Sequence, residues 1–118
     1  MIKYHKNDKK TVAEITADHP LISEVQDMLD LMGDCGVNDC YRIIIRDTSL
    51  HPDFFRLPTG LAGEILQKFS TYSYKLAVIG DFSKYKSKNL QDFIRESNKG
   101  NRIFFVNDFD QAIEKLLP

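Results

Sequence analysis

The sequence predicts an α/β protein with a single mixed sheet of about five strands and about four helices. Residues 41–45, 75–79 and 102–106 are apolar at nearly every position. Strands that are apolar on both faces are typical of a parallel sheet covered by helices. Helical patterns alternate with these runs, so we expect parallel C-terminal strands joined by right-handed crossovers. The length of 118 residues favours one domain over residues 1–118.

The N-terminal third predicts a strand pair and then a helix. Residues 1–4 and 11–16 alternate around the polar segment KNDKK, which indicates antiparallel strands at a sheet edge. In the next segment, apolar residues follow a helical period, with Asp18 or Ser23 as cap. Gly33 or Gly36 can end this helix. Its apolar residues are Leu21, Ile22, Val25, Met28, Leu29 and Met32.

Three further helices are expected near residues 59–71, 87–98 and 109–117. Thr59 is a candidate N-cap for the first, and Gly60 and Gly63 leave its first turn without side-chain bulk. Such a turn suits either close packing on the sheet or the approach of a ligand to free N–H groups. Asp108 and Gln111 are spaced as a capping pair for the last helix.

The connection formed by residues 48–58 is long and has no regular pattern. Loops of this length in small domains are often functional. Pro52 and Pro58 restrict its backbone. Of the adjacent Phe54 and Phe55, we expect at least one to be a buried anchor.

Composition argues against several classes of partner. Sixteen basic and seventeen acidic residues are interspersed along the chain, so no basic stripe for nucleic acid is evident. No apolar run approaches the roughly 20 residues that span a bilayer, and the N-terminus does not resemble a signal peptide. We therefore expect a cytoplasmic protein that binds neither nucleic acid nor membrane. Cys35 and Cys40 lack metal-site spacing and are expected to be ordinary thiols, with a redox pair as the alternative.

An aspartate follows each of the three apolar runs: Asp47, Asp81 and Asp108. In a parallel sheet these positions share the carboxyl edge, where ligands bind. Carboxylates at this edge can hold Mg²⁺ or orient a polar substrate. Aspartate also caps the helix or turn that follows a strand, and we favour that interpretation. No metal or other cofactor is therefore expected.

Other candidate binding residues are expected around the same edge. Arg56 directly precedes a helix start, which suits an anionic ligand. An internal ion pair of Arg46 or Arg56 with Glu64 is the competing interpretation. The predicted binding set is Arg46, Asp47, Phe55, Arg56, Thr59, Gly60, Glu64, Asp81 and Tyr85.

The strings FFRLPTGLAGEILQKF and LAVIGDFSKYKSKNLQDFIRESNKGNRIFFV resemble an uncharacterised bacterial family, the domain of unknown function numbered 4180. This resemblance implies no activity. More distantly, LPTGLAGEIL is similar to the STAS domains of anti-sigma-factor antagonists, in which a D-S-S-G-L-type turn opens the corresponding helix. Pro58 occupies the position of their phosphorylated serine, so the resemblance implies the fold and a partner-binding helix start, without that switch.

Together these features predict a non-enzymatic regulatory or protein-binding module that docks a protein partner through the helix start at Thr59 and the loop that precedes it. The alternative is a protein or enzyme that binds a small anionic ligand at the carboxyl edge. Assembly into a homo-oligomer is a third expectation that the sequence leaves open.

Overall fold

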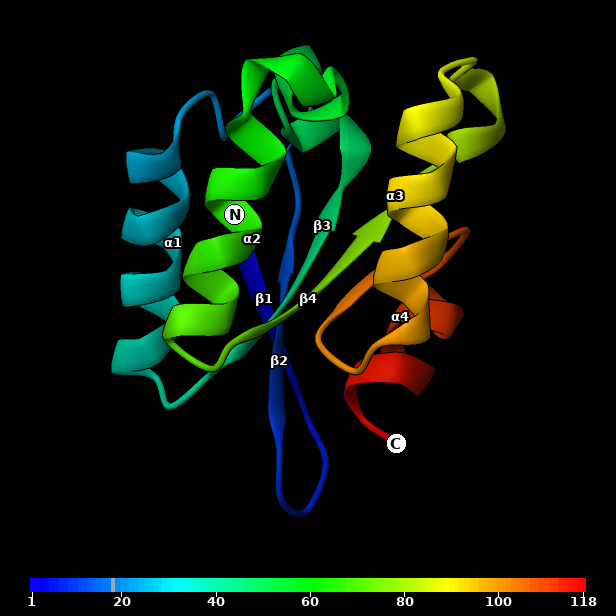
Figure 1. The fold of residues 1–118 in the computed structure, drawn as a ribbon. Helices are drawn as coiled ribbons and strands as arrows, with labels where there is room; N and C mark the ends of the chain where they lie inside the picture. Colours follow the sequence, from blue (N-terminus) through cyan, green and yellow to red (C-terminus); the bar gives the residue numbers. More distant parts are fainter. Residues whose placement is uncertain (18) are drawn as a thin grey trace.

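The computed structural model describes residues 1–17 and 19–118 and contains one five-stranded sheet (Figure 1). Its strands lie side by side in sequence order, with β1 antiparallel to β2 and all later neighbours parallel. The predicted mixed sheet is confirmed. The strands are β1 Ile2–Lys6, β2 Thr11–Ile15, β3 Arg42–Arg46, β4 Lys75–Ile79 and β5 Ile103–Val106.

Helices cover both faces of the sheet. Three of them pack on one face and α4 packs on the other (Figure 1). Their bounds are α1 Val25–Val37, α2 Leu61–Thr71, α3 Lys88–Lys99 and α4 Phe109–Leu116. Because both faces are covered, adjacent residues of a strand enter different cores. Ile43 and Ile45 of β3 lie under α1, α2 and α3, and Ile44 lies under α4.

The first helix begins later and ends later than the sequence predicted. The side chain of Asp27 accepts hydrogen bonds from the N–H groups of Ser23 (2.9 Å) and Glu24 (3.2 Å), so Glu24 is the N-cap and Ser23 is not. The other predicted cap, Asp18, lies outside the described residues. Ile22 is not helical and instead forms an isolated bridge with Leu50.

Neither Gly33 nor Gly36 ends α1, which continues to Val37. Gly36 is needed for packing instead. A Cβ at this position would lie 2.6 Å from the hydroxyl oxygen of Tyr74, which donates a hydrogen bond to the carbonyl of Met32 (2.9 Å). The prediction that Gly36 ends the helix failed because this glycine makes room for the side chain of Tyr74, which is distant in sequence.

The last helix starts as predicted, with the carboxylate of Asp108 accepting from the N–H of Gln111 (2.9 Å). Gly100 is the C-cap of α3. The Asn98 side chain, near the end of the same helix, reaches the edge strand β5 and forms hydrogen bonds with both backbone groups of Phe105. Cys35 and Cys40 are both buried and free.

Candidate functional site

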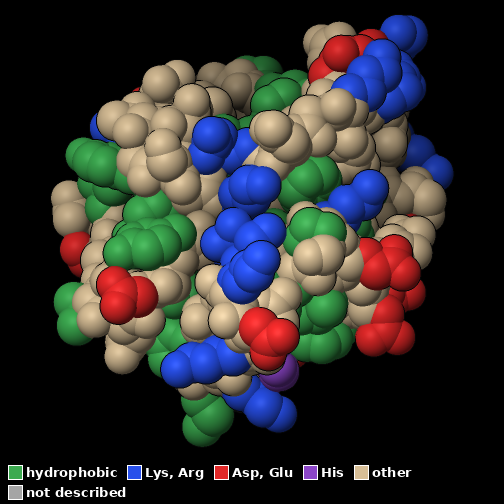
Figure 2. All heavy atoms as spheres, turned by 90° about the horizontal axis from the view of Figure 1, so that it is seen from below, with side chains coloured by type: hydrophobic (Ala, Val, Ile, Leu, Met, Phe, Trp, Pro, Cys, Tyr) green, Lys and Arg blue, Asp and Glu red, His purple; other side chains and the backbone are tan. Residues whose placement is uncertain are grey.

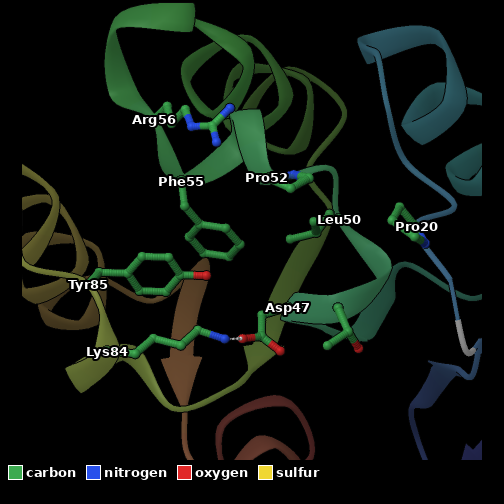
Figure 3. Close-up of a pocket in the computed structure, with 9 residues that line it drawn as sticks. Pro20, Asp47, Leu50, Pro52, Phe55, Arg56, Lys84 and Tyr85 are labelled. Carbon is green, nitrogen blue, oxygen red and sulfur yellow. Dashed lines mark hydrogen bonds and ion pairs between the residues drawn. The ribbon is translucent and has the colours of Figure 1, made fainter.

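A cleft of about 380 Å³ opens at the carboxyl edge of the parallel strands (Figure 3). It lies between the turns that follow β3 and β4. Ligands of open α/β sheets bind at this edge. The cleft is lined by Pro20, Asp47, Thr48, Leu50, Pro52, Phe55, Arg56, Lys84 and Tyr85.

One wall of the cleft is the connection from β3 to α2. The sequence predicted an irregular loop, but the chain forms three short 3₁₀ turns, Asp47–Ser49, Pro52–Phe55 and Leu57–Thr59. Phe54 and Phe55 are both buried, with 1% and 6% of their surface exposed. These two anchors hold the connection against the core, so the cleft wall is part of the packed structure.

Aromatic rings form one apolar wall of the cleft. The rings of Phe55 and Tyr85 are stacked, with centroids 4.8 Å apart and planes inclined by 19°. Phe82, from the turn after β4, packs behind both rings. Burial raises the pKa of the Tyr85 hydroxyl, so this group stays neutral and able to donate a hydrogen bond at physiological pH.

An ion pair crosses the cleft floor. The Lys84 Nζ lies 2.7 Å from Oδ2 of Asp47, whose side chain is only 11% exposed (Figure 3). The hydrogen bond to Asp47 raises the pKa of the Lys84 ammonium group. Lys84 is 51% exposed, so it still faces solvent and incoming ligands.

Arg56 lies on the cleft rim with 67% of its side chain exposed. Its Nη1 lies 2.9 Å from Oδ1 of Asp53, so Arg56 does form an ion pair, but its partner is Asp53 and not Glu64. An exposed pair of this kind contributes about 0–1 kcal/mol and leaves the guanidinium group available.

Arg46 is not in the cleft. Arg46 is two residues from Ile44 on β3, and side chains two residues apart on a strand lie on the same face of the sheet. Because Ile44 belongs to the core under α4, Arg46 lies on the α4 side. There its Nη2 lies 3.5 Å from Oε2 of Glu14. Glu64 lies on the exposed face of α2, outside the cleft, and no ion pair joins it to a described residue. Strand alternation and helix phase therefore separate residues that the sequence grouped together.

The start of α2 differs from the prediction. Its N-cap is Gly60, whose φ of 80° is a conformation that favours glycine. Thr59 lies one residue earlier, where its hydroxyl contacts the carbonyl oxygens of Asp53 (2.7 Å) and Arg56 (2.9 Å). It also accepts from the N–H of Leu61 (3.3 Å). Thr59 thus ties the end of the connection together.

Two of the three edge aspartates act as caps. Asp81 accepts hydrogen bonds from the N–H and hydroxyl groups of Ser83, and Asp108 caps α4. Asp47 is paired with Lys84. Within residues 1–17 and 19–118, no three His, Cys, Asp or Glu side chains are grouped to hold a metal ion. Capping accounts for Asp81 and Asp108 without a shared metal site.

The predicted binding set is therefore divided. The cleft brings together Asp47, Phe55, Arg56 and Tyr85. Arg46, Thr59, Gly60, Glu64 and Asp81 are not among its lining residues. Sequence reasoning missed Lys84, although a lysine beside Tyr85 just beyond a buried strand was a usable signal. It also missed the apolar lining residues Pro20, Leu50 and Pro52, which nothing in the local sequence marks.

Comparison with known proteins identifies a family but no activity. The family model described as a domain of unknown function (DUF4180) matches residues 7–116. No curated protein and no solved structure matches the chain. The similarity to STAS domains therefore stays a prediction. Among the described residues, no helix has the length and apolar character needed to cross a bilayer.

Proposed function

The chain belongs to the DUF4180 family of domains of unknown function, and we propose that it is a non-enzymatic module that binds a small anionic ligand in the carboxyl-edge cleft. The observation that carries this proposal is that two cations, Lys84 and Arg56, line one cleft that also has apolar walls. Lys84 comes from the turn after β4, and Arg56 comes from the connection before α2. Neither side chain is buried, so both can reach an anion.

The size of the cleft favours a small molecule. Ligand pockets usually have volumes of about 300–1,000 Å³, and this one is at the lower end. A carboxylate or phosphate group can contact either Lys84 or Arg56, which lie at opposite ends of the cleft (Figure 3). The flat or apolar remainder of such a ligand would lie along the rings of Phe55 and Tyr85 (Figure 3).

The chemistry of the lining argues for binding without catalysis. The described lining residues include no His, Cys or Ser, and the hydrogen bond to Asp47 holds the Lys84 amine as an unreactive ammonium group. The carboxylate of the cleft, Asp47, is engaged by Lys84. An incoming anion competes with Asp47 for Lys84, and the released carboxylate provides a route by which ligand binding can be signalled to a partner.

Docking of a protein partner at the start of α2 is a second candidate function. Pro58, Thr59 and Glu64 are exposed there, and Glu64 has no ion-pair partner among the described residues. This surface is adjacent to the connection that forms the cleft wall. A ligand in the cleft could therefore influence a partner bound there, which is the regulatory part of the proposal.

A ligand screen followed by mutation of the two cations tests the proposal. Small carboxylates and phosphate esters are screened by thermal shift, and hits are measured by calorimetry. We expect Lys84→Met and Arg56→Ala each to weaken binding of a hit about tenfold or more. Arg56→Ala should change the melting temperature little, because its ion pair is exposed.

Arg95→Ala is the matched control. Arg95 forms an i,i+3 pair with Asp92 on α3 and is 60% exposed, but it does not line the cleft. Equal losses of affinity in Arg56→Ala and Arg95→Ala would contradict a specific site. If Arg56→Ala instead unfolds the protein, Arg56 is a structural residue and the proposed site loses one of its two cations.

A further inference from the structure

A row of basic side chains lies at the opposite, amino edge of the sheet. Each of the four parallel strands begins with Lys or Arg, or directly after one. The residues are Lys10, Arg42, Lys75 and Arg102. Figure 2 views this edge and shows Lys and Arg side chains forming a band across its middle. We call these four residues the basic row.

Strand register places three members of the basic row side by side. Arg42 pairs with Lys75 across β3 and β4. Leu76 pairs with Ile103, so Arg102 lies beside Lys75 on the other side. Neighbouring strands are about 4.8 Å apart, so these three positions span about 10 Å. Lys10, Arg42 and Lys75 have the strand parity that faces α4, because Val12, Ile44 and Ala77 belong to the core under α4. The Arg102 side chain instead extends towards the end of α2, where its Nη1 donates to the carbonyl groups of Phe69 (3.5 Å) and Tyr74 (2.9 Å).

The row is not neutralised by the protein. No ion pair joins any of the four to a described Asp or Glu, although all four are half-buried. Nε of Arg42 is buried without a hydrogen-bond acceptor. Burial, together with the charges of Arg42, Lys10 and Arg102, lowers the pKa of Lys75. Grouping like charges in this way costs folding energy that an anion would recover.

We propose that the basic row binds a compact anion that carries linked phosphate groups, of the diphosphate or triphosphate class. The two guanidinium groups suit phosphate oxygens because their N–H groups form a planar fork, and Lys75 adds a point charge between them. Arg102 is held in place by its hydrogen bond to the carbonyl of Tyr74 (2.9 Å). Lys10 is positioned to contact an outer phosphate.

The geometry favours a compact anion over a long polyanion. Three cations at one level across about 10 Å match a short chain of phosphates. A nucleic acid strand would need a charged path that extends beyond the row, whereas the chain as a whole has a net charge of −1. This site is independent of the carboxyl-edge cleft, so each proposal can fail alone.

Inorganic triphosphate is the direct probe. We expect triphosphate to raise the melting temperature of the protein, because it binds the folded state and not the unfolded state. Its binding should also be measurable by calorimetry. Sodium sulfate at matched ionic strength controls for screening. Lys75→Met should weaken triphosphate binding about tenfold or more. Lys75→Met should also be at least as stable as the parent without triphosphate, since it removes like-charge repulsion.

Lys88→Met is the matched control, because Lys88 is 87% exposed on α3 and lies outside the basic row. Lys10→Gln is a second variant of the basic row. It removes one positive charge and leaves the partly buried side chain of Arg42 in place. Equal stabilisation by sulfate and triphosphate would overturn the proposal, as would unchanged triphosphate binding in both row variants. Tighter binding of a short single-stranded oligonucleotide than of triphosphate would overturn the assignment of a compact ligand.

Discussion

Gly80 lies directly against the carboxyl group of Asp47. A Cβ added at Gly80 would be 2.7 Å from both Cγ and Oδ2 of Asp47. The absence of a side chain at the end of β4 therefore allows the carboxylate that follows β3 to lie beneath Lys84. The cleft floor therefore depends on the contact between Asp47 and Gly80, which directly follow the neighbouring strands β3 and β4.

We expect Gly80→Ala to displace Asp47 and separate it from Lys84. Overpacking at such a contact costs about 1–3 kcal/mol of unfolding free energy, measurable by urea denaturation. In an Asp47→Ala background the same substitution should cost less, because the clashing carboxyl group is gone. An equal cost in both backgrounds would show that Gly80 has another role.

Gly33→Ala is a control for glycine replacement itself. Gly33 lies within α1, and nothing is within 4 Å of an added Cβ. Alanine is favoured over glycine in a helix interior, so this variant should be more stable by about 0.5–1 kcal/mol. A loss of stability would contradict the continuous helix through this position.

Thr59 should contribute to stability through its hydroxyl group. Thr59→Val keeps the shape of the side chain but removes the contacts to Asp53 and Arg56, so we expect a loss of about 1 kcal/mol by urea denaturation. Thr59→Ser should retain most of the stability. The phosphomimetic Thr59→Glu breaks the same contacts. A change in partner capture by Thr59→Glu therefore supports a phosphorylation switch only if Thr59→Val leaves partner capture unchanged.

Asn98 protects the open edge of the sheet at β5. Its Oδ1 accepts from the N–H of Phe105 (2.7 Å), and its Nδ2 donates to the carbonyl of Phe105 (3.1 Å). Asn98→Ala should lower the unfolding free energy by about 1–3 kcal/mol and increase aggregation, measured by light scattering. Asn89→Ala, at an exposed position of the same helix, should do neither.

The Asp81 cap predicts a dependence of stability on pH. Hydrogen bonds from the hydroxyl and N–H groups of Ser83 lower the pKa of Asp81 below its ordinary value of 3.8. A carboxyl group whose pKa is lower in the folded than in the unfolded protein stabilises the fold at pH values above its unfolded pKa. This stabilisation is lost as the pH falls through the folded pKa. Ser83→Ala should therefore be less stable than the parent near neutral pH, and the difference should shrink below pH 3.8. A difference that does not vary with pH would exclude the hydroxyl contact as its cause.

Some site residues could be predicted because their position follows from a local pattern. Asp47 directly follows a buried strand, and Phe55 and Arg56 lie in the connection after it. Arg46 was assigned to the same edge, but its strand parity with Ile44 points it to the other face. That alternation was readable from the sequence once the strand bounds were known.

The basic row shows the opposite situation. The sequence analysis found no basic stripe, because Lys10, Arg42, Lys75 and Arg102 are about thirty residues apart along the chain. Parallel pairing brings the starts of successive strands to one edge, so residues separated by a whole strand and helix become neighbours. Periodicity within one segment contains no information about this juxtaposition.

The sequence by itself determined the alternation of strands and helices, the parallel C-terminal sheet and the aspartates at its carboxyl edge, because these depend on local hydrophobic periodicity. Tertiary structure alone decided that Lys84 pairs with Asp47 above Gly80, that both phenylalanines of the connection are buried, and that four cations share the other edge. The physical reason is that strand pairing and helix packing set these contacts between residues distant in sequence.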